Sequence, residues 1–263
     1  MVLTQDLKLL EEKSIYVIRE AKMKFENVAA LWSMGKDSTA MLALARKAFL
    51  GKVPFPVIHI DNGIDFPETY KFRETLAKKW NLDLIIGEGK IKPEMQGYSC
   101  CGYNKAEELK KLMGQYGFDA LIVSIRRDEH GIRAKERYFS PRDEKFKWNY
   151  KNQPAEVWNN YTSRMDKKGH IRVHPLIDWN EADIWNYTMK AKVPMNPLYF
   201  PTDGYRFRSL GCTHCTVPTP SNANTIPKMI KELETTKVDE RAGRQQTKEK
   251  EYIMQKLRAL GYM

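Results

Sequence analysis

The feature that most constrains this chain is the segment of residues 33–39, which reads Ser-Met-Gly-Lys-Asp-Ser-Thr. It follows a short apolar run at residues 28–32, and after it apolar residues recur with helical spacing from Met41 to Phe49. This order predicts a strand, a tight polar turn and a helix. Backbone N–H groups, hydroxyl groups and one ammonium group would then meet at a helix N-terminus, where the helix dipole favours an anion. The segment is not a Walker loop, because it lacks the two spaced glycines and the Gly-Lys-Ser/Thr ending.

Strands and helices are predicted to alternate along most of the chain. Amphipathic or apolar-periodic segments predict helices at residues 5–25, 66–80, 104–116 and 227–234, and near residues 248–260. Short apolar runs predict further strands at residues 57–60, 82–86, 118–125 and 171–177. This alternation favours an α/β fold, a doubly wound parallel sheet with helices on both faces. We expect a core domain at residues 1–175 and a loop- and helix-rich C-terminal subdomain at residues 176–263, packed on the same core.

Composition narrows the class of protein and of partner. The chain has 263 residues, with 42% hydrophobic residues and a formal net charge of +11. No apolar run reaches the ~20 residues of a membrane span, and the N-terminus does not read as a signal peptide, so we expect a cytoplasmic protein without a membrane partner. The positive charge favours an anionic partner, which is a nucleotide, sulfate, nucleic acid or an acidic subunit.

Four cysteines occur as two close pairs, Cys100-Cys101 and Cys212-x-x-Cys215. Adjacent cysteines seldom bond to each other, and structural disulfides are rare in the cytoplasm. Two pairs without a remaining cysteine are typical of four thiolate ligands of one centre. The second pair is predicted to lie in a loop of the C-terminal part.

Two further segments carry chemistry at the predicted ligand-binding edge. A dense run of mixed charge, Arg126-Arg-Asp-Glu129, follows the fourth predicted strand, so its arginines either contact phosphates or form an exposed salt-bridged helix. Residues 138–170 are rich in aromatic residues and show little periodicity, which predicts a long excursion over the site. Its aromatic side chains either form a local core or stack on bases.

These motifs resemble a known family. The segment Ser33-Met-Gly-Lys-Asp-Ser38 is similar to the pyrophosphate loop of the N-type ATP pyrophosphatases (PP-loop proteins), in the form found in the phosphoadenosine-phosphosulfate (PAPS) reductase family. From residue 5 to about residue 245 the chain resembles the small subunit of bacterial sulfate adenylyltransferase. This resemblance rests on the loop and on further stretches, namely His59-Ile-Asp61, Arg126-Arg-Asp-Glu129, Arg133-Ala-Lys-Glu-Arg137, Trp158-Asn, Phe207-Arg-Ser-Leu-Gly-Cys212 and Glu240-Arg-Ala-Gly-Arg244.

The resemblance implies a Rossmann-like, adenine nucleotide α-hydrolase-like fold and an enzyme that cleaves ATP to AMP and pyrophosphate by adenylating an acceptor oxygen. It implies that Mg²⁺ bridges the leaving phosphates. The catalytic candidates are Lys36, Asp37, Arg126 and Arg127, and Asp128 with Glu129 would hold either the arginines or the metal. The candidates for nucleotide binding are Ser33, Met34, Gly35, Lys36, Asp37, Ser38, His59, Asp61 and Arg126.

The cysteines are similar to the [4Fe–4S] ligands of the adenylylsulfate reductases in the same superfamily, which would make Cys100, Cys101, Cys212 and Cys215 cluster ligands. A Zn²⁺ site with four cysteines and a metal-free set of thiols are the alternatives. Those reductases also use a further C-terminal cysteine, and no cysteine follows Cys215 here, which disfavours reduction of a sulfonucleotide.

Two functions remain as predictions. The first is sulfur transfer to nucleic acid, of the DNA phosphorothioation type, with a cysteine desulfurase or another sulfur donor as partner. The sequence leaves open whether the protein forms a homodimer. The alternative is the second subunit of sulfate adenylyltransferase, which makes adenylylsulfate from ATP and sulfate with a GTPase subunit as partner. The extent of the match favours this alternative, whereas the four cysteines favour sulfur transfer.

Overall fold

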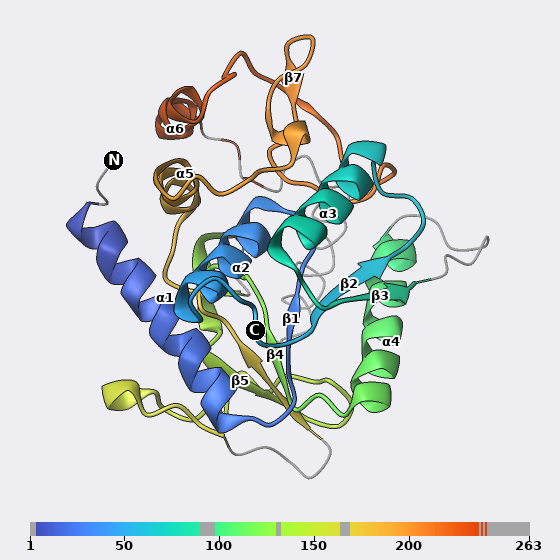
Figure 1. Cartoon of the computed structure of the whole chain (residues 1–263), viewed down its shortest axis with the longest axis vertical. Helices are drawn as coiled ribbons and strands as arrows, with labels where there is room; N and C mark the ends of the chain where they lie inside the picture. Colours follow the sequence, from blue (N-terminus) through green and yellow to red (C-terminus); the bar gives the residue numbers. More distant parts are fainter. Residues whose placement is uncertain are drawn as a thin grey trace, which may run out of the picture.

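The computed structural model describes residues 4–89, 98–129, 133–163, 169–236, 238 and 240, and for residues 98–103 the backbone alone. A six-stranded sheet with the order β3-β2-β1-β4-β6-β5 forms the centre of the molecule (Figure 1). Its strands are β1 Val28–Leu31, β2 Val57–Asp61, β3 Leu84–Glu88, β4 Ala120–Ile122, β5 Phe139–Arg142 and β6 His170–Val173. Five of them are paired in parallel, and β5 runs antiparallel to β6.

Helices cover both faces of this sheet, because alternate strand residues point to opposite sides. Val28 and Ala30 of β1 belong to one hydrophobic cluster together with α1 Gln5–Lys24 and α2 Lys36–Ala48. Ala29, between them, packs on the other face with Leu109 and Leu112 of α4 Tyr98–Tyr116. Figure 1 shows α1 and α2 on one side of the strands and α4 on the other. The predicted doubly wound α/β sheet is therefore confirmed.

The close packing of α4 on the sheet depends on a glycine. A Cβ atom on Gly87 of β3 would lie 2.7 Å from Cδ1 of Leu112 and 2.9 Å from Cδ1 of Ile60. Such distances are shorter than real side chains allow, so a larger residue would push the helix away from the strands. The adjoining helix α3, Pro67–Trp80, starts with proline at its first position, where the missing N–H group has no helical partner to lose.

The C-terminal part packs on the same core and adds a small layer of its own. Leu176, Ile177 and Trp179 belong to the cluster formed by α1 and α2, and the buried hydroxyl of Ser14 in α1 donates to the carbonyl of Pro175 at 2.7 Å. Figure 1 shows α5, α6 and β7 gathered at one end of the molecule. The remaining elements are η1 Arg127–Glu129, η2 Arg133–Lys135, η3 Val157–Asn159, α5 Glu181–Lys190, η4 Pro197–Tyr199, β7 Tyr205–Arg206, β8 Thr219–Pro220 and α6 Ile226–Thr235.

The predicted elements are found with two corrections. The stretch of residues 138–170 is not a continuous excursion, because Phe139–Arg142 forms the edge strand β5 and makes the sheet mixed rather than wholly parallel. The fourth helix, α4, spans Tyr98–Tyr116 rather than residues 104–116, so Cys100 and Cys101 lie within its first turns. A capping box formed by Asn180 and Asp183 begins α5. The helix predicted near residues 248–260 lies outside the described residues, and the division at residue 175 stays a prediction.

Among the residues that the structure describes, none of the helices combines the length and the apolar character that a membrane span requires.

Two buried histidines at the ends of β6 should make folding stability depend on pH. Burial lowers the pKa of His170 and of His174 to about 3. At a pH below about 6.5, the ordinary pKa of histidine, both imidazoles take up a proton in the unfolded chain but stay neutral in the folded chain. The folded state therefore loses stability as the pH decreases from about 6.5 towards 3. Urea unfolding at pH 7 and pH 5 should give a lower free energy of unfolding at pH 5. A His174→Gln variant should lose part of this dependence, and an equal free energy at both pH values for the wild type would contradict the expectation.

Candidate active site

The polar turn after β1 forms a compact loop at the carboxyl edge of the sheet. The N–H group of Ser33 donates to Oγ of Ser38 at 3.3 Å, and the two hydroxyl oxygens are 3.2 Å apart. Met34 adopts a left-handed backbone conformation (φ 56°), while its side chain is buried in the hydrophobic core. Gly35 then precedes α2, and a Cβ atom there would lie 3.2 Å from Oγ of Ser33. The loop is thus closed by its own hydroxyl groups around a position where only a small residue fits without displacement.

A tyrosine from the C-terminal part completes the start of α2. The buried hydroxyl of Tyr199, in η4, accepts a hydrogen bond of 2.8 Å from the N–H group of Lys36. This N–H group is one of those that a helix N-terminus leaves without a helical partner. Tyr199 therefore fixes the N-terminus of α2 from across the molecule.

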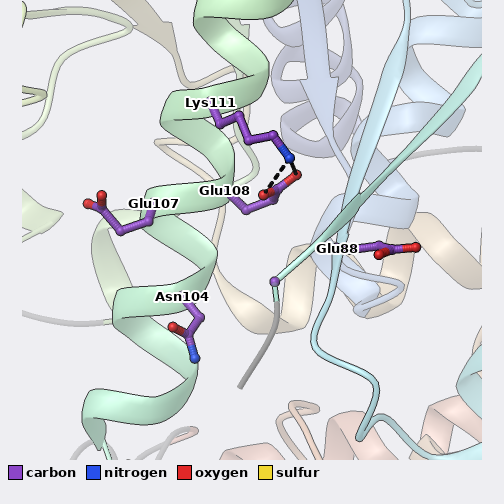
Figure 2. A pocket seen from close by; sticks show the side chains of 6 residues that line it. Glu88, Asn104, Glu107, Glu108 and Lys111 are labelled. Carbon is purple, nitrogen blue, oxygen red and sulfur yellow. Dashed lines mark hydrogen bonds and ion pairs between the residues drawn. The ribbon is translucent and has the colours of Figure 1, made fainter. Parts of the chain in front are cut away.

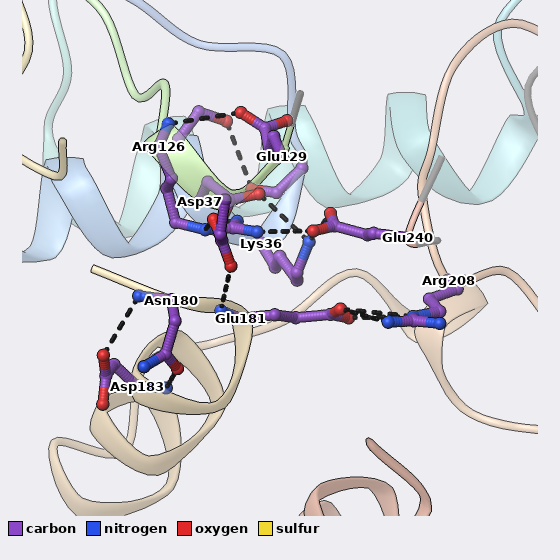
Figure 3. Close-up of polar contacts among 12 residues, drawn as sticks. Lys36, Asp37, Arg126, Glu129, Asn180, Glu181, Asp183, Arg208 and Glu240 are labelled. Carbon is purple, nitrogen blue, oxygen red and sulfur yellow. Dashed lines mark hydrogen bonds and ion pairs between the residues drawn. The ribbon is translucent and has the colours of Figure 1, made fainter. Parts of the chain in front are cut away.

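Two buried cations lie beside this loop. The side chain of Lys36 is 1% exposed and that of Arg126 is 0% exposed. The Lys36 ammonium donates to Asp37 at 3.1 Å and pairs with Glu240, and the Arg126 guanidinium donates to Asp128 at 2.9 Å and pairs with Asp37 and Glu240. Figure 3 shows the Glu240 side chain pointing towards both cations. Buried charges are tolerated when they are paired in this way.

The pairing shifts the pKa values of these groups. Burial alone would lower the pKa of Lys36, but the charges of Asp37 and Glu240 raise it above its ordinary range. Burial alone would raise the pKa of Glu240, but Lys36 and Arg126 lower it to about 2. Lys36 is therefore a permanent cation and Glu240 a permanent anion at neutral pH.

The other charged residues of the predicted site hold arginines in place. The Asp128 carboxylate accepts from Arg126 and from the N–H group of Glu181 at 3.0 Å, and the Glu129 carboxylate pairs with Arg133. This geometry agrees with the salt-bridge interpretation of the two carboxylates.

Arg127 points elsewhere, since its guanidinium pairs with Asp178, whereas that of Arg126 pairs with Asp37 of the loop; neither arginine is among the residues that line the cavity described next. The loop and Arg126 are thus brought together, whereas Arg127 is not.

A cavity of about 310 Å³ opens over the loop. Segments from both halves of the chain reach it, and the apolar part of its wall comes from Leu31, Val123, Ile125 and Leu210. Its polar lining consists of Ser33, Lys36, Asp37, Ser38, Asp65, Thr69, Lys105, Ser124, Glu129, Arg133, Tyr199, Ser209 and Glu240, together with Gly35 and Gly211. A phosphate group can be held at the loop end, while the apolar wall can cover a flat ring.

His59 and Asp61, predicted to bind nucleotide, lie on β2 close to Asp65, and of these three residues Asp65 alone lines the cavity. Ligand atoms of the three residues lie within 4.8 Å of one another, which is a geometry that could hold a metal ion. However, the Asp61 carboxylate already accepts from Gly63, Tyr70 and Arg73 at 2.7–2.9 Å. Asp61 therefore fixes the turn after β2, and its role at the nucleotide stays a prediction.

The second cysteine pair lies directly behind the cavity. Cys212 and Cys215 are each 3% exposed and pack with Ile64 from the loop after β2. The N–H group of Thr213 donates to the Ile64 carbonyl at 3.0 Å, which ties the two loops together. Gly211, next to Cys212, lines the cavity. The side chains of Cys100 and Cys101 lie outside the described residues, so the predicted four-cysteine centre stays a prediction.

A second cavity, of about 420 Å³, lies between β3 and α4 (Figure 2). Its wall is mainly acidic, and the Lys111 ammonium donates a hydrogen bond to the Glu108 carboxylate on the same helix. The lining residues are Glu88, Gly89, Asn104, Glu107, Glu108 and Lys111. This wall does not suit a polyphosphate.

Sequence reasoning missed two residues of the site. Glu240 lies in a stretch that resembles the family, but nothing in its local pattern shows that it reaches a loop 204 residues earlier. Tyr199 sits between prolines in a loop-like stretch and carries no signal at all. Arg208 lies in one of the stretches that resemble the family, and it donates to the Glu181 carboxylate at 2.8 Å (Figure 3).

Comparison with known proteins gives the family. Residues 27–218 match the phosphoadenosine phosphosulfate reductase domain family. The sulfate adenylyltransferase subunit 2 of Psychromonas ingrahamii is 39% identical over 97% of both chains, and that of Pseudomonas paraeruginosa is 40% identical over 90% of this chain and 92% of the relative. The chain therefore belongs to the phosphoadenosine phosphosulfate reductase domain family, as the phosphate loop predicted. The prediction of an enzyme of the adenylyltransferase type is confirmed.

Solved structures give the same fold at lower identity. The FMN adenylyltransferase of Candida glabrata superposes with a TM-score of 0.61 at 18% identity, over 91% of this chain and 87% of that one. The PAPS reductase of Candida auris does so with a TM-score of 0.53 at 20% identity, over 82% of this chain and 99% of that one. The adenine nucleotide α-hydrolase-like fold is confirmed.

The hydrogen bond from Lys36 to Tyr199 gives a first prediction for the site. A Tyr199→Phe variant should lower the free energy of unfolding by about 1–2 kcal/mol, because a buried N–H group loses its acceptor. Urea unfolding measures this loss. A Tyr205→Phe variant is the control, since Tyr205 is 53% exposed and its hydroxyl removal should change stability by less than about 0.5 kcal/mol. Equal stability of the two variants would contradict the capping role of Tyr199.

Proposed function

We propose that the protein is the ATP-binding small subunit of a sulfate adenylyltransferase, which transfers AMP from ATP to sulfate. The observation that carries this proposal is the pair of buried cations beside the phosphate loop, where Lys36 begins α2 and lines a cavity of about 310 Å³, and Arg126 shares its anions Asp37 and Glu240. Relatives that match nearly the whole chain carry that name, which supports sulfate as the acceptor. The alternative predicted from the sequence is thus better supported than sulfur transfer.

In the proposed reaction a sulfate oxygen attacks the α-phosphorus of ATP and forms a new P–O bond, while the bond from that phosphorus to the bridging oxygen breaks. Pyrophosphate leaves with that bridging oxygen and the electron pair. Lys36 and Arg126 would neutralise the charge that develops on it, and the Ser33 and Ser38 hydroxyls with the N-terminal end of α2 would orient it. Because the reactants carry several negative charges, positioning and charge neutralisation would supply most of the rate.

The carboxylates of Asp37 and Glu129 line the cavity and would hold a magnesium ion, which prefers such oxygens, if they exchanged their ion pairs with Lys36, Arg126 and Arg133 for it. When bound, the ion neutralises charge on the leaving phosphates. The relatives are named as the second subunit of their enzyme, which supports the presence of a partner subunit here. This proposal includes the prediction that the partner subunit is a GTPase.

The proposal predicts that Lys36→Ala abolishes release of pyrophosphate from ATP in the presence of sulfate, because the leaving group loses its buried ammonium. An assay for released pyrophosphate, run with sulfate and a GTPase subunit, measures this. Removal of an oxyanion-stabilising donor typically costs about 100-fold or more.

Lys47→Ala is the matched control. Lys47 lies on the same helix and pairs with Glu11 at 2.8 Å, away from the cavity, so its loss should leave the rate within about twofold. Undiminished turnover by Lys36→Ala would refute the assignment of the loop.

One observation favours a second function. The buried Cys212 and Cys215 adjoin the cavity, as a thiolate centre beside an adenylation site would. In that case the acceptor would be a nucleic acid that is adenylated and then receives sulfur from a cysteine desulfurase. Release of pyrophosphate that depends on DNA or RNA, and not on sulfate, would select this function.

The two cysteines have the spacing and burial of metal ligands, so they fit one edge of a [4Fe–4S] cluster or of a zinc site. Such a group would supply a structural link between the loop after β2 and the segment that follows β7.

Cys212→Ser should lower the iron, labile sulfide or zinc content of anaerobically purified protein and lower its melting temperature. Thr213→Ala is the control, because it removes a hydrogen bond to Ile64 from the same segment without removing a thiol. Metal content that is equal in both variants and the wild type would speak against this ligand pair.

A further inference from the structure

Glu240 occupies an unusual position in the candidate active site. Its carboxylate pairs with the Lys36 ammonium through one oxygen and with the Arg126 guanidinium through the other, and its side chain is only 8% exposed (Figure 3). It also lines the cavity over the phosphate loop. A carboxylate that bridges two cations in this way presents two oxygens to the groups that would bind two oxygens of a phosphate.

The three anions that pair with these cations differ in how they are held. Asp37 follows Lys36 on the first turn of α2, and Asp128 lies two residues after Arg126 in η1. Both are therefore fixed beside the cations by the same local backbone. Glu240 lies 204 residues after Lys36, beyond the end of α6 at Thr235, and in the part of the chain that the structure describes it belongs to neither a helix nor a strand. Of the three, Glu240 is the anion that a ligand can replace.

A further cation holds the backbone next to Glu240. The Arg208 guanidinium donates to the carbonyl of Val238 at 2.5 Å and to the Glu181 carboxylate at 2.8 Å. Arg208 is 15% exposed and lies on the segment between β7 and the cysteines. The described contacts of the Glu240 carboxylate and of the Val238 carbonyl are thus polar contacts to three cations, which a more highly charged anion can exchange.

We propose that Glu240 is an internal ligand of the phosphate-binding site, which occupies the place of a phosphate group until pyrophosphate or the pyrophosphate moiety of ATP displaces it. This inference rests on the proposed function only in assuming that the loop binds phosphates. In the empty site Glu240 keeps the two buried cations paired, which avoids the cost of leaving them uncompensated. When pyrophosphate leaves, the carboxylate can return to the same cations.

Displacement has a measurable cost in affinity. When a site is open for only a fraction of the time, the apparent dissociation constant rises by the inverse of that fraction. Glu240→Gln keeps the size of the side chain but removes its charge, so it should increase the open fraction. The Kd for inorganic pyrophosphate, measured by titration calorimetry without ATP or sulfate, should fall about tenfold if the carboxylate fills the wild-type site nine-tenths of the time.

Two further variants complete the experiment. Glu232→Gln is the matched control, because Glu232 lies on α6 and its carboxylate pairs with Arg206 and accepts from Ser221, outside the cavity. Its Kd for pyrophosphate should equal that of the wild type. Arg208→Met weakens the hold on the Val238 carbonyl, and it is combined with Glu181→Gln so that no buried carboxylate is left unpaired near Lys36. This variant too should tighten pyrophosphate binding, and it decides the matter if Glu240→Gln does not fold.

The outcomes separate this inference from the proposed function. Tighter binding in Glu240→Gln, or in the double variant Arg208→Met with Glu181→Gln if the former does not fold, supports the internal ligand. If the wild type binds pyrophosphate and the folded variants bind it equally or more weakly, the role of Glu240 is overturned while the phosphate loop stands. If neither the wild type nor a folded variant binds pyrophosphate, both the internal ligand and the proposed function are overturned.

Discussion

The rest of the site depends on the ion pairs that two buried cations, Lys36 and Arg126, form with nearby carboxylates. Lys36 begins α2 a few residues after β1, and Arg126 follows β4, which pairs with β1 through Ala30 and Ile122. Because parallel neighbours end at the same edge, the sheet brings the two cations together without any contact between distant side chains. Neither cation is more than 1% exposed, so each requires anions at close range. The loop, the turn after β4 and the C-terminal segment are all organised around that requirement.

The sheet and the phosphate loop could be predicted because their signals are local. Apolar runs of strand length, a polar turn and a helical period lie within about twenty residues of each other, and the alternation of strands with helices then implies parallel pairing. The edge strand β5 could not be predicted in the same way, since its sequence Phe139-Ser-Pro-Arg142 contains a proline and shows no clear alternation. It forms because it pairs with β6 from the neighbouring position, which is a property of the fold.

The contacts that complete the site were beyond sequence reasoning for a related reason. Tyr199 reaches the N–H group of Lys36 across 163 residues, and Glu240 reaches its ammonium across 204 residues. No spacing rule connects positions so far apart. The cysteines illustrate the opposite case, because a short Cys-x-x-Cys spacing predicted a ligand pair, and the structure buries Cys212 and Cys215 together beside the cavity. A short motif could be recognised from the sequence, and the ligand role of the cysteines stays a prediction. The position of the motif next to a distant loop could be found only from the folded structure.

A site whose cations are already paired binds its ligand by exchange, and this has consequences for selectivity. A monovalent anion that replaced Glu240 would gain little, because it would carry no more charge than the carboxylate that it displaces. Pyrophosphate and the polyphosphate of ATP carry more charge and more acceptor oxygens, so they can outcompete the internal carboxylate at both Lys36 and Arg126. The net charge of +11 adds long-range attraction for any anion, but it does not distinguish among them. The preference for polyphosphates would therefore arise at the buried pair of cations, from the anion that must be displaced there.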